Sequence, residues 1–176
     1  MDGRTYIQAI NKIISLLQDY SSKELLDEDG NKLFIEKAEA VPMEMLERFE
    51  KLHQLRLPDD LRDFLLFSNG INIFGTKIYS LDEMELFPEN KVLSFHSWGN
   101  GDFDCISVDN GDEYGRVFFM NHSVSNLVSI NISFVEWVFG VIREIECKGV
   151  LLHPMDYRIR RETGMYKDVS YKLKII

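Results

Sequence analysis

Apolar residues recur at helical spacing in four stretches of the chain, and each stretch predicts a helix that buries one face. The first stretch lies within residues 6–17. The next two begin at Pro42 and Pro58, because proline fits the first turn of a helix, where its missing N–H costs nothing. The fourth runs over residues 133–145, where Ser133 and Glu136 have the spacing of a capping box. The helix that begins at Pro42 is expected to bury Met45, Leu46, Phe49 and Leu52.

After Asn69-Gly70, a dipeptide suited to the left-handed turn at the end of a helix, the apolar pattern becomes that of strands. Brief strands are expected around residues 33–35, 71–74 and 78–79. Longer runs over residues 92–98, 103–109 and 115–122 are separated by turn-forming dipeptides and predict an antiparallel meander. In the last of these runs Phe118, Phe119 and Met120 are consecutive and apolar, which predicts a central strand that is covered on both faces. The alternating residues 171–176 predict a strand at the carboxyl terminus.

Helices and strands are segregated along the chain rather than strictly alternating, which favours the α+β class. We expect a single domain over residues 1–176, built on a mainly antiparallel, twisted sheet of about five to six strands with helices packed against it. The expected core spans about residues 43–145, and residues 148–176 form a basic carboxyl-terminal extension.

Charge is unevenly distributed along this chain, whose net charge is −9. Residues 1–147 contain 13 Lys and Arg against 26 Asp and Glu, whereas residues 148–176 contain 7 against 3. An acidic body repels nucleic-acid phosphates and anionic membranes and attracts basic proteins. Neither nucleic acid nor membrane is therefore expected as a partner, although simple solubility also accounts for acidic charge. The sequence has no apolar run of about 20 residues and no signal-peptide pattern, so we expect a cytoplasmic protein.

Several short motifs, taken together and in order, resemble the SUKH superfamily, which includes bacterial toxin-immunity proteins and a fungal regulator of cell-wall synthesis. The resemblance extends from about Met43 to about Ile145, and it depends on the order and spacing of the motifs rather than on any one of them. The matching residues are Leu57-Pro58, Phe64-Leu65, Asn69-Gly70, Phe95, Gly101-Asp102-Phe103, Cys105-Ile106, Asp109, Gly115-Arg116-Val117, His122 and Ser133-Phe134-Val135-Glu136-Trp137.

This resemblance implies an immunity protein that binds and neutralises a cognate bacterial toxin, often a nuclease. It implies no catalytic residues, so we expect no enzymatic activity. An intracellular regulatory interaction module of the fungal type is the alternative. The acidic body agrees with a basic toxin as the partner, because its negative potential would speed the encounter.

The expected contacts with this partner are acidic and aromatic side chains at the sheet edge and the adjoining turns. Trp98 is included because tryptophan is favoured at binding hot spots, although the sequence slightly favours a packing role in the core or at its rim. Asp102 suits a partner contact, but an Asp at this turn also hydrogen-bonds backbone N–H groups. The full set is Trp98, Asp102, Asp104, Asp112, Glu113, Glu83 and Glu85.

A small metal-dependent enzyme is a further alternative, with His96, Asp102, Asp104 and His122 as ligands. These residue types suit zinc or iron, but no local pair has characteristic ligand spacing, so no metal is expected. The only glycine-rich turn joins two strands and does not lead into a helix, so no nucleotide cofactor is expected either. Cys105 is expected to be a small buried hydrophobic residue.

Overall fold

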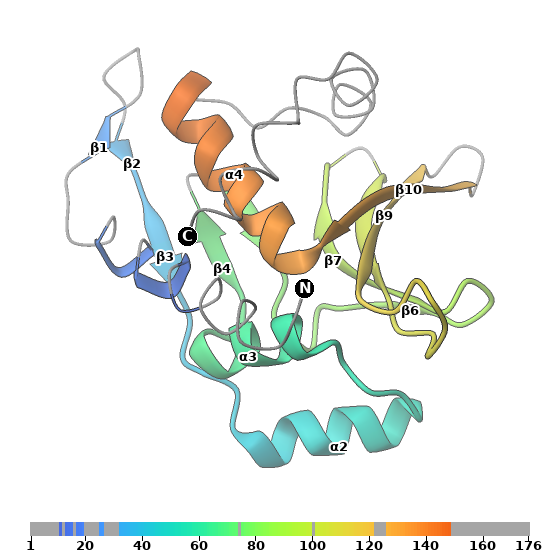
Figure 1. Cartoon of the computed structure of the whole chain (residues 1–176). Helices are drawn as coiled ribbons and strands as arrows, with labels where there is room; N and C mark the ends of the chain where they lie inside the picture. Colours follow the sequence, from blue (N-terminus) through green and yellow to red (C-terminus); the bar gives the residue numbers. More distant parts are fainter. Residues whose placement is uncertain are drawn as a thin grey trace.

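The computed structural model describes residues 11, 13–15, 17–19, 25–26, 32–73, 75–99, 101–121 and 126–148 of the chain, and its elements are labelled in Figure 1. Residues 11, 13–15 and 17–19 are helical, with Ile13 and Leu17 buried. The longer helices are α2 (Met43–His53), α3 (Asp59–Phe67) and α4 (Phe134–Lys148). The strands are β1 (Leu25–Leu26), β2 (Lys32–Leu33), β3 (Ile35–Lys37), β4 (Ile71–Ile73), β5 (Thr76–Ile78), β6 (Leu86–Phe87), β7 (Val92–Ser97), β8 (Phe103–Ser107), β9 (Arg116–Asn121) and β10 (Asn126–Ser133).

Two antiparallel sheets carry most of these strands. The larger has the order β10-β9-β8-β7-β6 and the smaller the order β3-β4-β5, while β1 and β2 form a separate pair. The backbone N–H of Tyr79, just after β5, donates to the carbonyl of Phe95 on β7 over 2.8 Å and joins the two sheets. The predicted α+β class is therefore confirmed, and so is the meander, which corresponds to β7, β8 and β9.

Two strands of the larger sheet, β6 and β10, were not predicted from the sequence. The edge strand β6 has only two residues, in a segment that reads as a turn. The other edge strand, β10, contains Asn and Ser between its apolar residues, and its pairing with β9 shifts between Ser129 and Ser133. Asn131 has a positive φ of 56° at this irregularity. Edge strands need less continuous apolar character than central ones, which explains why the pattern was weak. The strand predicted over residues 171–176 lies outside the described residues.

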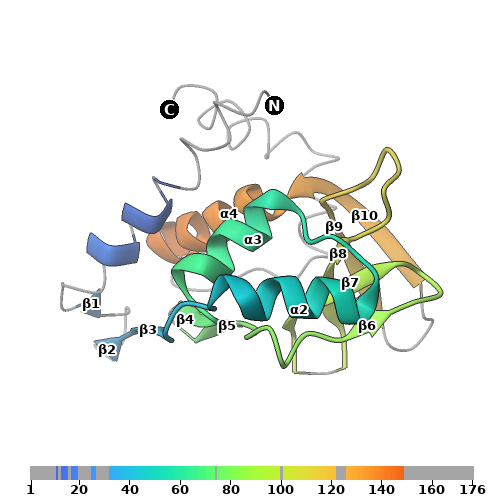
Figure 2. The same cartoon turned by 90° about the horizontal axis from the view of Figure 1, so that it is seen from below.

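The main core lies between the larger sheet and helices α3 and α4, which contact each other (Figures 1 and 2). At its centre the Phe134 ring packs edge-on against Phe64 and Phe95, with both ring-centroid distances at 5.2 Å. The predicted capping box begins α4, because the Ser133 backbone N–H donates to the Glu136 carboxylate over 2.8 Å. The burial expected for the consecutive apolar residues of β9 is also observed, since residues 117–120 are all buried.

Helix α2 lies at the periphery, alongside α3 (Figure 2), and its expected apolar face is only partly buried. Leu46 is buried and Phe49 is half-buried, but Met45 is 52% and Leu52 is 72% exposed. The prediction of four buried residues was therefore wrong for Met45 and Leu52. An outer helix faces solvent over much of its surface, so it buries a narrower stripe than its apolar pattern suggests.

The end of α3 differs from the predicted left-handed cap. Ser68, which follows the helix, is extended (φ −155°), and the positive φ of 85° occurs at Gly70. A Cβ at Gly70 would meet the backbone nitrogen of Ser80 at 2.8 Å. Glycine is thus required here by close packing against residues 78–80 as well as by backbone conformation.

Candidate functional site

The segment over residues 80–113 contains nine carboxylates and a single lysine, Lys91. We refer to it as the acidic segment. It includes β6, β7 and β8 with their connections, and seven of its nine carboxylates are exposed. Such a density of negative charge produces a field that attracts cationic partners. The exposed members are Asp82, Glu83, Glu85, Glu89, Asp109, Asp112 and Glu113.

Glu83 and Glu85 lie on the connection before β6, at the edge of the larger sheet. The Glu83 carboxylate pairs with Lys77 and accepts hydrogen bonds from the Ser80 backbone N–H at 3.0 Å and hydroxyl at 2.8 Å. These donors lower the pKa of Glu83 to about 2, chiefly through Lys77. Glu85 is exposed, and its backbone exchanges hydrogen bonds with Ser94 on β7. Glu83 is thus occupied within the fold, whereas the Glu85 carboxylate faces solvent.

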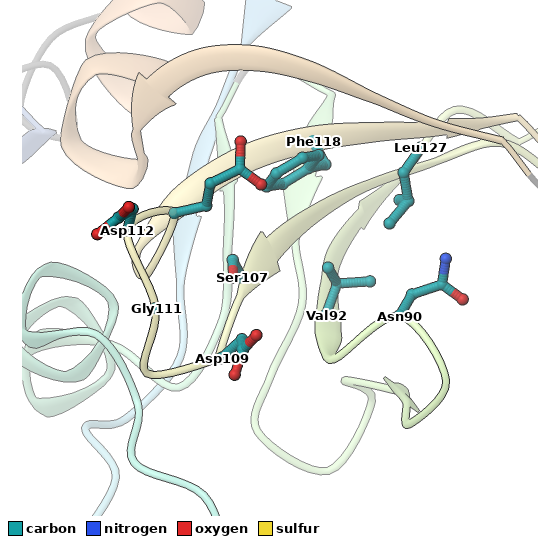
Figure 3. A pocket seen from close by; sticks show the side chains of 9 residues that line it. Asn90, Val92, Ser107, Asp109, Gly111, Asp112, Phe118 and Leu127 are labelled. Carbon is teal, nitrogen blue, oxygen red and sulfur yellow. The ribbon is translucent and has the colours of Figure 1, made fainter.

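Asp112 and Glu113 lie at a pocket of about 180 Å³ on the face of the larger sheet that α3 and α4 do not cover (Figure 3). Val92 of β7 and Phe118 of β9 are buried in this face and belong to a small second apolar cluster, against which Leu127 of β10 packs. The pocket therefore combines an apolar lining with an acidic rim. The lining residues that matter here are Val92, Phe118, Leu127, Asp109, Asp112 and Glu113.

One carboxylate of this rim is already paired. The Lys91 ammonium lies 3.0 Å from Asp109 Oδ1, and both side chains are more than half exposed. In the part of the chain that the structure describes, neither Asp112 nor Glu113 has an ion-pair or side-chain hydrogen-bond partner. Two negative charges at the pocket are thus available to a cation from outside.

Asp104 lies on the opposite face of the sheet, where it is completely buried. Its Oδ2 accepts hydrogen bonds from the indole nitrogens of Trp98, at 3.0 Å, and Trp137, at 3.1 Å. Among the described residues, its Oδ1 has no hydrogen-bond partner. Burial raises the pKa of Asp104 to about 8, with a further contribution from the nearby negative charge of Asp102.

His96 pairs with Asp104 across β7 and β8, because the register shifts between Ser94 and His96. The extra residue, Phe95, makes this irregularity a bulge, so Phe95 and His96 can both pack against Trp137. Their ring centroids lie 5.0 and 5.3 Å from that of Trp137. The Nδ1 of His96 lies 2.8 Å from the carbonyl of Lys77, and burial lowers the pKa of this histidine.

The structure corrects the expectation that Asp102 and Asp104 present carboxylates to a partner. Asp102 is only 2% exposed, and its carbonyl accepts a hydrogen bond from the Trp98 N–H, which closes the turn between β7 and β8. The alternation of the strand turns Asp104 into the core. Trp98 is half-buried, so part of its ring is accessible, and its role as a partner contact stays a prediction.

The described members of the suggested metal site, His96, Asp102 and Asp104, do not form a metal-binding group. No group of three His, Cys, Asp or Glu side chains that could hold a metal ion occurs within the described residues, and His122 lies outside them. The Nδ1 of His96 already contacts the carbonyl of Lys77. The Oδ2 of Asp104 already accepts hydrogen bonds from the two indoles. Cys105 is a buried free thiol, and burial raises its pKa far above the usual range, as expected for a small hydrophobic residue.

Two features of the site were missed in the sequence. Asp60 was interpreted only as negative charge at the start of α3, but it is buried and reaches α4. Its Oδ1 accepts from the Leu61 N–H over 3.0 Å and its Oδ2 from the Val135 N–H over 3.3 Å. Burial raises its pKa to about 6, and these backbone donors limit the rise. The apolar lining of the pocket was also missed, because β10 was not recognised as a strand.

A family model for the SMI1/KNR4 family (SUKH-1) matches residues 40–140 of the chain. This match covers more than half of the sequence and includes α2, α3, the larger sheet and the start of α4. The chain therefore belongs to the SMI1/KNR4 (SUKH-1) family, in a superfamily of immunity proteins and regulators that act through protein–protein interaction. A comparison with curated proteins found no match.

None of the described helices has the length and apolar character needed to cross a membrane.

Proposed function

We propose that this protein is an immunity protein, which binds a cognate bacterial toxin in the cytoplasm and blocks it without performing chemistry. The observation that carries the proposal is the acidic segment, in which nine carboxylates accompany one lysine. Family membership supports the role, because immunity to toxins is one of the activities of the superfamily. The toxin would be a basic protein, and a nuclease fits because its surface must attract phosphates.

The proposed mechanism has two parts. The negative field of the acidic segment would accelerate the encounter with a cationic toxin by about 10- to 1,000-fold at low salt. Partly exposed aromatic and aliphatic side chains, such as Trp98 and Leu127, would then slow dissociation by burying apolar area. An excess of carboxylates at this surface would also compete with the phosphates of a nucleic-acid substrate.

Co-expression tests this proposal directly. The toxin gene in the neighbourhood of this gene would be expressed in a sensitive host, with and without this protein. We expect growth to be rescued and a complex to be purified whose association rate falls steeply between about 50 and 500 mM salt. Absence of rescue together with absence of a complex would contradict the proposal. A gene neighbourhood without a toxin would instead favour the regulatory module of the fungal type.

A further inference from the structure

The pocket beside Asp112 and Glu113 has the chemistry of a receptor for one cationic side chain. Its volume of about 180 Å³ is well below the roughly 300–1,000 Å³ of small-molecule and cofactor sites. The pocket is therefore too small for a nucleotide and suits a single amino-acid side chain.

Resting on the proposed function, we infer that this pocket receives a lysine or arginine side chain of the protein partner. Both of these side chains combine an apolar stem with a charged head. The buried surfaces of Val92 and Phe118, with Leu127 beside them, would contact the stem. The carboxylates of Asp112 and Glu113 would contact the charged head at the rim.

Charge in and around the pocket favours a cation over other occupants. Three carboxylates line it, and within the described residues the only ion pair among them is that of Asp109 with Lys91. An anionic or neutral ligand would leave Asp112 and Glu113 facing apolar or like-charged groups, which costs free energy. A purely apolar side chain would fill the floor but would desolvate the carboxylates of the rim without compensation.

The surrounding sheet supports a docking role for this face. Among the described elements, α3 and α4 pack on the other face of the larger sheet, and the pocket face carries the second apolar cluster. Figure 3 shows Val92, Phe118 and Leu127, which lie on β7, β9 and β10, beside the loop that carries Asp109, Gly111 and Asp112. The strands hold the apolar floor rigidly, so a side chain that enters meets a preorganised site.

A titration of the isotope-labelled full chain, followed by NMR, tests the pocket itself. The probes are two blocked tripeptides, acetyl-Gly-Lys-Gly-amide and the same peptide with norleucine, which keeps the stem but has no charge. We expect saturable shifts of the Ser107, Gly111 and Leu127 amide signals with the lysine peptide and much smaller shifts with the norleucine peptide. Equal shifts with both peptides, or no saturable shift at the pocket, would overturn the inference.

Matched variants separate a specific pocket from general acidity. The double variant D112N/E113Q removes two charges from the rim, and E39Q/E47Q removes two exposed charges elsewhere. All four side chains are exposed, and the substitutions keep their shape, so both variants should fold. We expect D112N/E113Q to abolish the pocket shifts and E39Q/E47Q to preserve them. Equal losses in the two variants would contradict a specific pocket.

The same variants distinguish this inference from the proposed function. If the wild-type protein binds its toxin, D112N/E113Q should weaken the complex by about tenfold, and E39Q/E47Q by less than about twofold. A toxin complex that D112N/E113Q leaves intact would remove the pocket from the interface while the immunity function stands. A wild-type protein that binds no toxin would refute the proposed function, whereas the peptide titration would still decide whether the pocket takes a cation.

Discussion

The indole nitrogen of Trp137 on α4 donates a hydrogen bond to Oδ2 of Asp104 on β8 over 3.1 Å, and both residues are buried. This bond joins α4 to β8, the central strand of the larger sheet, although the two residues are 33 positions apart in the sequence. Because Trp98, in the turn after β7, donates to the same oxygen, Asp104 connects this turn, β8 and α4. A buried carboxyl group thus links the larger sheet to α4, on the face of the sheet opposite the pocket.

Asp104→Asn should flatten the dependence of stability on pH between about 6.5 and 8. The folded pKa of about 8 exceeds the unfolded value near 3.8, so the native state holds a proton that the unfolded state releases. The stabilisation by this group is complete below pH 4 and is lost as the pH rises towards 8, with a slope of at most about 1.4 kcal/mol per pH unit. Urea denaturation at several pH values measures this slope.

The pH window isolates Asp104 from its neighbours. Asp60, with a pKa of about 6, loses its own stabilising contribution mostly below this range, and the lowered pKa of His96 reduces stability mainly below the ordinary histidine pKa of 6.5. Burial raises the pKa of Cys105, so its contribution falls at alkaline pH. If Asp104→Asn retained the wild-type slope, Asp104 would not be the group that titrates.

Trp137→Phe should lower the free energy of unfolding by about 2–4 kcal/mol. The substitution removes a donor from the buried Asp104 carboxyl group and leaves a cavity beside Phe95 and His96. Trp98→Phe is the matched control, because it removes the other donor from a half-buried position and should cost only about 1 kcal/mol. Chemical denaturation measures the free energy of unfolding of both variants. Equal losses in the two variants would show that the packing of Trp137 in the core contributes no stability beyond its hydrogen bond.

Gly70→Ala should be distinctly more destabilising than Gly75→Ala. Both glycines have positive φ, 85° and 91°, so each alanine incurs a conformational cost of roughly 1–2 kcal/mol. Only at position 70 would the new Cβ also meet a backbone atom, the Ser80 nitrogen at 2.8 Å, whereas at position 75 no described residue beyond the two chain neighbours lies within 4 Å. We expect an additional loss of about 1–3 kcal/mol for Gly70→Ala. Thermal denaturation of the two variants checks this difference.

Asp60→Ala should cost about 2 kcal/mol, and Asp59→Ala less than about 0.5 kcal/mol. The first removes the acceptor of two backbone N–H groups and leaves that of Val135 buried without a partner. The second removes an exposed carboxylate whose ion pair with Arg56 is screened by solvent. Equal melting temperatures for the two variants would contradict the bridging role of Asp60 between α3 and α4.

The boundaries of regular elements were predictable where a local signal was strong. Proline at positions 42 and 58 and the capping box at 133–136 place the starts of α2, α3 and α4 within a residue of those observed. The meander was predictable because apolar runs alternate with turn residues. In contrast, the exposure of Met45 and Leu52 was not predictable. An apolar stripe shows that a helix has a buried side, but it does not show how much of that side the neighbouring elements cover.

The candidate site was only partly predictable. The acidic segment can be counted in the sequence, and Asp112 and Glu113 lie at a pocket as members of it. Asp102 and Asp104 belong to the same run of charge, yet both are buried, because strand alternation and the turn between β7 and β8 direct them inward. A count of carboxylates in the sequence cannot distinguish the buried ones from the exposed ones, because the side-chain chemistry is the same in both.

The sequence by itself determined the class of fold, the family, the starts of the helices and the excess of negative charge, because each of these depends on residues that are close along the chain or on composition. Only the tertiary structure decided which carboxylates face solvent and which accept hydrogen bonds from tryptophan. It also decided that Val92, Phe118 and Leu127 share a pocket with Asp112 and Glu113. The physical reason is that burial and pocket formation arise from contacts between strands, whose register and bulges no local pattern specifies.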